Sequence, residues 1–437
     1  MMRTRGLLRL VGIIGTALVV LGLLLSMACT APPGEPTGTE TAAPEDQPLK
    51  FGAEICWTGV AAEKCQPMGD GLLDSIKYIN EEKGGVQGHP IEVVDRDSGY
   101  DTSKMATIAR GWIDEGMPLF TTCSSKMMES AMAISNRAGM PGICDFCSTK
   151  CVHPPKHVYA QSPGYGDETL AFLEHFKNNI WDGDGTIKLA LHILNNPTGY
   201  GAQMACRAKA EEMGYEVVAV EEHKAETMSE METLTRIEEE NPDVLFISST
   251  PAPTSVILKN AKDQGIDIPI GMAHASFVPD VLMEMAGADV LEGIYGVYPT
   301  AAFDTPESDA PGIAKVKEYS SEYSKEYYES ESLDYLCHWA HGLVVYKIFE
   351  TAMENASYEE IMEGPKEQRW KTIEEEGIKK LETYDMEGLT GPLTAPTEKD
   401  HRLIKAVKLY QIQEGEKVLL AEPEAPLVPY EEYEWFE

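Results

Sequence analysis

Apolar and polar positions follow two alternating periods along the first third of the chain. Short apolar runs typical of strands separate longer stretches in which apolar residues recur at helical spacing. The strands are expected at residues 49–57, 91–95, 118–123 and 141–145, and the helices at residues 68–82, 103–115 and 126–138. Strand and helix in strict alternation predict a parallel sheet with helices on both faces.

The same alternation restarts after the turn at residues 182–185, which predicts a second unit of the same kind. Strands are expected at residues 187–194, 215–220 and 244–248, and helices at residues 201–213, 229–239 and 254–264. Farther on, the pattern indicates helices at residues 314–329 and 333–352 and a strand at residues 405–411. Because the turn is too short to be a free linker, we expect two α/β units that lie close together with a cleft between them.

The N-terminal residues have the pattern of an export signal. Arg3, Arg5 and Arg9 precede an apolar run at residues 10–25, and small residues lead from that run to Cys29. The run is shorter than the roughly 20 residues that a helix needs to cross a bilayer. We therefore expect cleavage of a signal peptide at residues 1–28, with an uncleaved membrane anchor as the alternative.

Cys29 and the segment after it predict a tethered protein. A cysteine directly after a small residue resembles the lipobox of bacterial lipoproteins, in which that cysteine is acylated, although Ser26 stands where such boxes usually carry leucine. The resemblance implies a lipid anchor at Cys29. Residues 29–48 hold Pro, Gly, Thr and acids without apolar periodicity, so we expect them to form a flexible tether.

Length and charge narrow the functional classes. The about 390 residues from Leu49 onward suffice for two cores, since single cores stop growing at about 250–300 residues. The net charge of −36 makes nucleic acid and anionic lipid poor partners. The chain has no Gly-x-Ser-x-Gly, phosphate-binding glycine loop or His-Glu-x-x-His motif, which argues against an enzyme. We expect neither a cofactor nor a metal.

Several motifs, taken in order, resemble the periplasmic binding proteins of the branched-chain amino acid type, which are the solute receptors of ABC importers. The resemblance runs from about residue 49 to about residue 414. A single motif is a weak signal. Several motifs in the right order are strong evidence for the family, but they are weak evidence for the identity of the ligand. The motifs are Thr58-Gly59 with residues 66–68 and Gly71, the glycine-rich segment 84–94, Asp95-Arg96-Asp97, residues 103–112, 196–201, 242–245 and 391–393, and Asp400.

The resemblance implies the α/β fold of type I periplasmic binding proteins, in which two doubly wound parallel-sheet lobes are joined by a hinge of three crossings. Lobe one is expected to comprise residues 49–165 and 297–385, and lobe two residues 166–296 and 386–421. Residues 422–437 form an acidic tail. A ligand in such a fold binds in the cleft, beyond the carboxyl ends of the parallel strands.

In the family, hydroxyl and backbone N–H groups after the third and fourth strands hold the carboxylate of the ligand. Ser124 matches the first position, and Ser148 with the backbone of Cys147 matches the second. Unpaired N–H donors and the helix dipole favour an anion at such a place, while simple helix capping is the alternative role of both serines. The candidate ligand-binding residues of the first lobe are Trp57, Thr58, Ser124, Ser125, Cys147, Ser148 and Thr149.

The second lobe contributes two further candidates through the same resemblance. Tyr200 matches a family tyrosine that closes over the ligand, and Thr250 follows a predicted strand. An aromatic lid suits a partly apolar solute. Ordinary turn packing is the alternative for Tyr200.

Residues 271–274 depart from the family pattern. Amino-acid receptors carry an acid there that pairs with the ammonium group of the ligand, whereas this chain has Ala273 and His274. Because a buried ammonium without a countercharge is costly, we expect His274 to bind an acceptor or amide group instead. A solvated histidine is the alternative, and an α-amino acid would fit only if Asp280 or Glu284 reached the cleft.

Eight cysteines remain outside the anchor, and an even number in an exported protein permits disulfides. Cys56 and Cys123 end neighbouring predicted strands, with Cys65 as an alternative partner for either. A metal and free thiols are the alternatives near the single Cys-x-x-Cys motif, but a zinc ribbon would need a second such pair. The candidates for disulfides are Cys56, Cys65, Cys123, Cys144, Cys147 and Cys151.

The sequence as a whole favours an extracytoplasmic, lipid-anchored, monomeric solute-binding protein. The expected ligand is a small amino acid or related organic acid with a carboxylate or amide group. The expected partners are the permease and the ATPase of an ABC importer, and closure of the cleft would signal binding to them. A ligand-binding component of a sensory receptor with the same fold is the alternative.

Overall fold

The computed structural model describes residues 47–303, 305, 310–330 and 332–427. The predicted signal peptide, the anchor at Cys29 and nearly all of the tether lie outside the described residues, as does the end of the acidic tail from residue 428. These features therefore stay predictions. Within the described ranges, no helix combines the length and the apolar character needed to cross a membrane.

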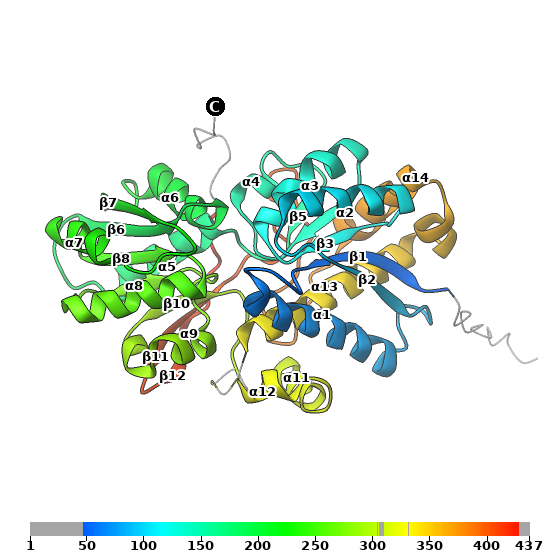
Figure 1. The fold of residues 1–437 in the computed structure, drawn as a ribbon. Coiled ribbons are helices and arrows are strands. Elements are labelled where there is room, and N and C mark those ends of the chain that lie inside the picture. Colours follow the sequence, from blue (N-terminus) through cyan, green and yellow to red (C-terminus); the bar gives the residue numbers. More distant parts are fainter. Residues whose placement is uncertain (1–46, 304, 306–309, 331, 428–437) are drawn as a thin grey trace, which may run out of the picture. The chain divides into compact units, whose positions relative to one another are not determined.

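The first lobe contains a five-stranded sheet in the order β2-β1-β3-β4-β5, and all neighbouring strands are parallel (Figure 1). Strand β1 lies inside the sheet and is almost entirely buried, which its apolar sequence LKFGAEI allows. The strands are β1 (Leu49–Ile55), β2 (Ile91–Asp97), β3 (Phe120–Thr122), β4 (Gly142–Cys144) and β5 (Val158–Ala160).

Helices from two separate parts of the sequence complete this lobe. Helix α1 begins at Ala62 rather than at the predicted residue 68, and the predicted helix 314–329 is interrupted at Ser324. The helices are α1 (Ala62–Glu82), α2 (Thr102–Glu115), α3 (Ser125–Ala138), α4 (Thr149–Val152), α11 (Pro311–Tyr323), α12 (Lys325–Glu329), α13 (Leu333–Asn355) and α14 (Lys366–Thr372), with short helical turns at Glu359–Glu363, Ile373–Gly377 and Ile378–Lys380.

The second lobe contains a seven-stranded sheet in the order β12-β11-β10-β9-β8-β6-β7. Its five parallel strands repeat the arrangement of the first sheet, and β11 and β12 extend the edge as an antiparallel pair. The strands are β6 (Ile187–Leu194), β7 (Tyr215–His223), β8 (Val244–Ser248), β9 (Ile270–Met272), β10 (Tyr295–Tyr298), β11 (Lys408–Gln413) and β12 (Glu416–Ala421).

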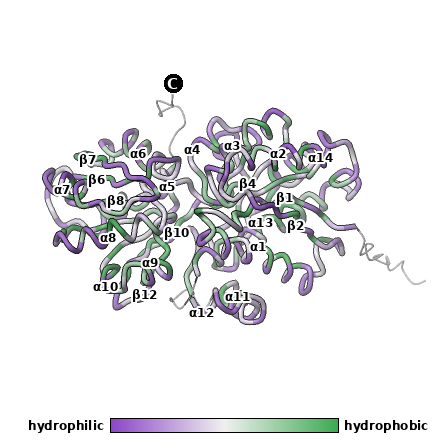
Figure 2. Tube along the Cα trace, in the orientation of Figure 1, coloured by the Kyte–Doolittle hydropathy of each residue, from purple (hydrophilic) through white to green (hydrophobic). Residues whose placement is uncertain are grey.

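Six helices accompany the second sheet. Helix α7 shows how they are amphipathic: it is mostly hydrophilic in Figure 2, while Leu234 and Ile237 are buried. The helices are α5 (Tyr165–Asn179), α6 (Pro197–Lys209), α7 (Met231–Glu239), α8 (Pro251–Gln264), α9 (Pro279–Ala286) and α10 (Ala288–Leu291).

The chain passes between the two sheets three times, after β5, after β10 and before β11. Neighbouring crossing segments are hydrogen-bonded: the Leu403 amide donates to the Ala160 carbonyl (2.8 Å), and the Ala301 amide donates to the Leu389 carbonyl (2.7 Å). The prediction of two doubly wound α/β lobes is confirmed. Strand β10 continues to Tyr298, so the crossing predicted at residue 297 falls inside this strand.

Candidate functional site

Trp57 and Thr58 follow β1 and are held by two carboxylates of the neighbouring strand β2. The indole Nε1 of Trp57 donates a hydrogen bond to Asp95 Oδ2 (2.9 Å), and the Thr58 hydroxyl donates one to Asp97 Oδ2 (2.7 Å). Partial burial acts to raise the pKa of Asp97, but the hydrogen bonds from Thr58 and Gly99 lower it. Trp57 and Thr58 therefore lie at the expected edge of the sheet. The Trp57 indole and the Thr58 hydroxyl already donate hydrogen bonds within the first lobe.

Ser124 and Ser125 stand at the start of α3. The Ser124 hydroxyl accepts the backbone N–H of Met127 (3.4 Å), so this serine takes the capping role. Ser125 is buried beside the Tyr165 side chain of α5, and it acts to lower the pKa of the Tyr165 hydroxyl, which burial raises. Ser124 therefore serves its helix, whereas Ser125 connects the first lobe to an element of the second.

Cys147, Ser148 and Thr149 form the turn between β4 and α4. The Ser148 hydroxyl donates to Glu129 Oε1 (2.6 Å) and does not cap α4, and the Cys147 thiol donates to the Ser148 carbonyl (3.3 Å). The Thr149 hydroxyl is buried and has no hydrogen-bond partner among the residues that the structure describes. Because buried polar atoms nearly always have a partner, Thr149 offers a hydroxyl to a bound molecule.

A cavity of about 240 Å³ adjoins this turn and is lined on its other side by α6 of the second lobe. Tyr200 contributes to that side, where burial and the nearby Glu222 carboxylate raise the pKa of its hydroxyl. The cavity brings together three predicted residues, whereas Thr250 precedes α8 and does not line it. The lining residues are Glu129, Ser148, Thr149, Lys150, Pro197, Tyr200, Gly201 and Met204.

His274 follows β9 and is only 1% exposed, so the solvated alternative is wrong. Its ring lies between the rings of Phe146 and Tyr165, at centroid distances of 4.2 and 4.9 Å. Its Nδ1 is 2.5 Å from Glu168 Oε2, which favours the tautomer with the proton on Nδ1. The other nitrogen, Nε2, is buried and has no hydrogen-bond partner in the described ranges.

Two acids of the second lobe were not found by sequence reasoning or were left open by it. Glu168 comes from α5, and burial raises its pKa although the neighbouring His274 acts in the opposite direction. Burial, followed by the nearby Asp334 carboxylate, raises the pKa of Asp280 to about 6. No motif marks Glu168 in the sequence, because only the fold brings α5 beside the end of β9.

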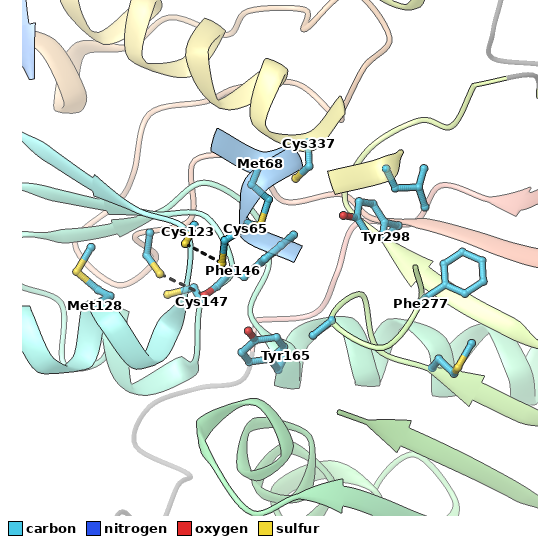
Figure 3. Close-up of a cluster of buried hydrophobic side chains, with 14 of the residues drawn as sticks. Cys65, Met68, Cys123, Met128, Phe146, Cys147, Tyr165, Phe277, Tyr298 and Cys337 are labelled. Atoms are coloured by element: carbon cyan, nitrogen blue, oxygen red, sulfur yellow. Dashed lines mark hydrogen bonds between the residues drawn. The ribbon is translucent and has the colours of Figure 1, made fainter. Parts of the chain in front are cut away.

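Phe146 is also the centre of a group of buried polar side chains from both lobes. The Lys64 ammonium lies 4.7 Å from the Phe146 ring centroid and 2.6 Å from Asp334 Oδ1. The Tyr298 hydroxyl of β10 donates to the same Asp334 oxygen (2.6 Å). Figure 3 shows Phe146, Tyr165 and Tyr298 within one buried cluster that also holds several cysteines.

His338 and His341 lie three residues apart on α13, and both are buried, with exposed fractions of 3% and 1%. His338 Nδ1 lies 2.9 Å from Asp145 Oδ2, and His341 contacts the Gln161 side chain. Burial acts against ionisation of Asp145, yet His338 lowers the pKa of this carboxyl. Helix α13 is therefore part of the interior beneath the cleft residues.

The six cysteines of the first lobe that are candidates for disulfides form two groups of three. In each group the three sulfur atoms lie within 4.8 Å of one another. The eight described cysteines have free thiols in this structure. The disulfides expected among six of them stay a prediction. The groups are Cys56, Cys65 and Cys123, and Cys144, Cys147 and Cys151.

Two α/β lobes that share buried polar groups beyond their strand ends define a solute-binding protein. Residues 48–417 match the family model of the periplasmic binding proteins. The chain belongs to this family, which confirms the resemblance seen in the sequence. It is accordingly a solute-binding protein that works outside the cytoplasm, and not an enzyme.

Solved structures with the same fold include proteins with different solutes. A branched-chain amino acid ABC transporter protein from Thermus thermophilus with bound valine is 21% identical, with a TM-score of 0.74 over 87% of this chain and 97% of that one. A fatty acid ABC transporter substrate-binding protein from Thermomonospora curvata is 20% identical, with a TM-score of 0.69 over 87% and 93%. An extracellular ligand-binding receptor from Rhodopseudomonas palustris HaA2 is 16% identical, with a TM-score of 0.69 over 85% and 99%. No curated protein sequence matches the chain.

Proposed function

We propose that this chain is the solute-binding protein of an ABC importer and captures a small carboxylate- or amide-bearing solute, an amino acid or related organic acid. The observation that carries the proposal is a pair of buried polar atoms without partners in the described residues, Thr149 Oγ1 of the first lobe and His274 Nε2 of the second. The turn that contains Thr149 also places Phe146 against the His274 ring. A solute that bonds to both atoms would satisfy them and join the lobes.

The surroundings of His274 favour a solute without an ammonium group. Glu168 supplies a buried acid, but one of its oxygens faces His274 Nδ1 and the other accepts the His274 backbone N–H (3.3 Å). Both of its oxygens are therefore already engaged by His274. An acid or amide can bond to His274 Nε2, which accepts a proton donor when the ring is neutral and donates when it is charged.

The permease and ATPase at the membrane are the proposed partners, and the proposed anchor is acylated Cys29. A monomer suffices, because the residues that carry the proposal all come from one chain. Closure of the lobes around the solute would provide the shape that the permease recognises.

The test is a thermal-shift screen of valine, leucine, their amides, and aliphatic and aromatic acids that lack the amine. A solute at 100 times its Kd should stabilise the protein by about 2.7 kcal/mol. Thr149→Val should weaken binding of the best solute by roughly fivefold, since a hydrogen bond is worth about 1 kcal/mol. Thr107→Val, on the exposed face of α2, is the matched control.

One result would contradict the proposed site, and a second would contradict the preference for a solute without an ammonium group. Equal affinities in the Thr149 and Thr107 variants would place the solute elsewhere. Preference for valine or leucine over their amine-free counterparts would retain the importer but overturn the argument from Glu168.

A ligand-binding receptor component is the second candidate, because the Rhodopseudomonas palustris receptor has the same fold. Binding and closure serve both roles equally well. Uptake of the labelled solute by cells separates them: deletion of the gene abolishes uptake if the chain serves an importer and leaves uptake unchanged if it serves a receptor.

A further inference from the structure

Three cysteines converge in the first lobe where β1, β3 and α1 meet. Cys56 follows β1, Cys123 follows β3, and Cys65 lies in the first turns of α1. All three are buried, and their sulfur atoms lie within 4.8 Å of one another. The shortest separation, between Cys65 and Cys123, is 3.4 Å and is drawn as a dashed line in Figure 3.

A buried glutamate completes this group. Glu54 of β1 is 1% exposed, and its two carboxyl oxygens lie 3.0 Å from the Cys56 sulfur and 3.6 Å from the Cys123 sulfur. The Ser98 hydroxyl donates to Glu54 Oε1 (2.5 Å). Within the described residues, no basic side chain forms an ion pair with Glu54. A buried carboxyl surrounded only by hydroxyl and thiol groups is protonated unless a cation binds beside it.

We propose that these three thiols and the Glu54 carboxylate bind one thiophilic divalent cation, with Zn²⁺ as the best fit. Tetrahedral zinc holds sulfur at about 2.3 Å and carboxylate oxygen at about 2.0 Å, so its ligand atoms lie roughly 3.5–3.8 Å apart. The sulfur–sulfur separation of 3.4 Å between Cys65 and Cys123 is close to these values. The separations of 3.0 and 3.6 Å from the Cys56 and Cys123 sulfurs run to different oxygens of Glu54, so the carboxylate would turn to present one oxygen to the ion. Binding releases the thiol protons to solvent, and Ser98 orients the carboxylate as an outer-shell donor.

The other groups of potential ligands fit a cation less well. The thiols of Cys144 and Cys147 donate to backbone carbonyls, and Cys151 contacts the Ser148 hydroxyl at the edge of the solute cavity. The cluster of Asp145, Cys337 and His338 belongs to the polar groups around Phe146. The proposed cation is independent of the solute, and it would fix β1, β3 and α1 to one another beneath the cleft.

The test is titration of the reduced, full-length protein with Co²⁺, followed by displacement with Zn²⁺. One equivalent of Co²⁺ should give a sulfur-to-cobalt charge-transfer band and the strong visible bands of a tetrahedral site, and one equivalent of Zn²⁺ should abolish them. Cys65→Ser should lose the charge-transfer band. Cys206→Ser should keep it, because this buried cysteine of α6 belongs to neither group of three.

Two milder variants keep the test decisive if Cys65→Ser fails to fold. Glu54→Gln preserves the size of the side chain and should weaken Zn²⁺ binding, and Ser98→Ala should weaken it roughly 10- to 100-fold. Absence of the band in the reduced protein overturns the proposal. So does a band that survives Cys65→Ser but is lost in Cys147→Ser, or a Cys65–Cys123 disulfide in protein isolated without reductant.

Discussion

Asp280 is a residue of the second lobe whose ionisation should be costly. It begins α9, its Oδ1 is buried without a hydrogen bond in the described ranges, and the Asp334 carboxylate lies nearby. Burial and then Asp334 raise its pKa to about 6, above the value of about 3.9 expected in the unfolded chain. Between these two values the folded protein binds more protons at this position than the unfolded chain does, so rising pH destabilises the fold.

Asp280→Asn should remove this pH dependence. As pH rises from 4 to 7, Asp280 should lower the free energy of unfolding of the wild-type protein by about 2 kcal/mol. The variant should not show this decrease. The measurement is urea unfolding of both proteins at several pH values, with the difference between them plotted against pH. A difference that stays constant from pH 4 to pH 7 would show that Asp280 titrates normally.

At the scale of single residues, the sequence predicts where a site residue lies better than it predicts which side chains that residue contacts. Ser148, Thr149 and Tyr200 could be found because each follows a motif at a strand end, and the structure places all three at one cavity. Glu168 and Asp145 could not, because their partners are distant in sequence: His274 lies 106 residues from Glu168. Contacts of that kind depend on how the lobes fold rather than on local spacing.

At the scale of elements, the first lobe depends on the packing of α13 against α1. The two helices are more than 250 residues apart in sequence, and Gly71 allows their close approach. A Cβ added at Gly71 would lie 2.3 Å from the Tyr335 carbonyl oxygen of α13, a backbone atom that cannot move aside alone. The glycine is therefore required by the distance between the helices, although glycine weakens a helix in itself.

Gly71→Ala should force α1 and α13 apart and lower the free energy of unfolding by about 1–3 kcal/mol, as overpacked interiors usually do. Gly364→Ala is the matched control, since its added Cβ would meet nothing closer than 3.5 Å. Chemical denaturation of the two variants measures the effect. Equal stability of both would mean that the helices separate at little cost.

The elements that the sequence missed have weak local patterns. Strand β5 has three residues and α4 has four, too few to show a period. Helix α5 is buried around much of its circumference, so its apolar residues form no single stripe. The start of α1 is polar and contains Pro67, which concealed its first turns. In contrast, the strands β6 and β8 have the predicted bounds because most of their residues are apolar.

At the scale of the whole molecule, contacts between the lobes include aromatic and polar ones. The Phe146 and His274 rings lie 4.2 Å apart, and the Tyr298 hydroxyl of the second sheet donates to Asp334 on α13 of the first lobe. Contacts of this composition can separate and re-form in water at lower cost than a large apolar interface. They suit lobes that open to admit a solute and close around it.

Solute binding should therefore compact the molecule. We expect the radius of gyration from small-angle X-ray scattering to fall when the best solute of the thermal-shift screen is added. Phe146→Ala removes the ring contact with His274, so it should lower the closed fraction and raise the apparent Kd by the same factor. Thr149→Val should weaken binding without changing the scattering of the ligand-free protein. If a bound solute leaves the scattering curve unchanged, closure does not accompany capture, and a permease would have to recognise the solute-loaded protein by other means.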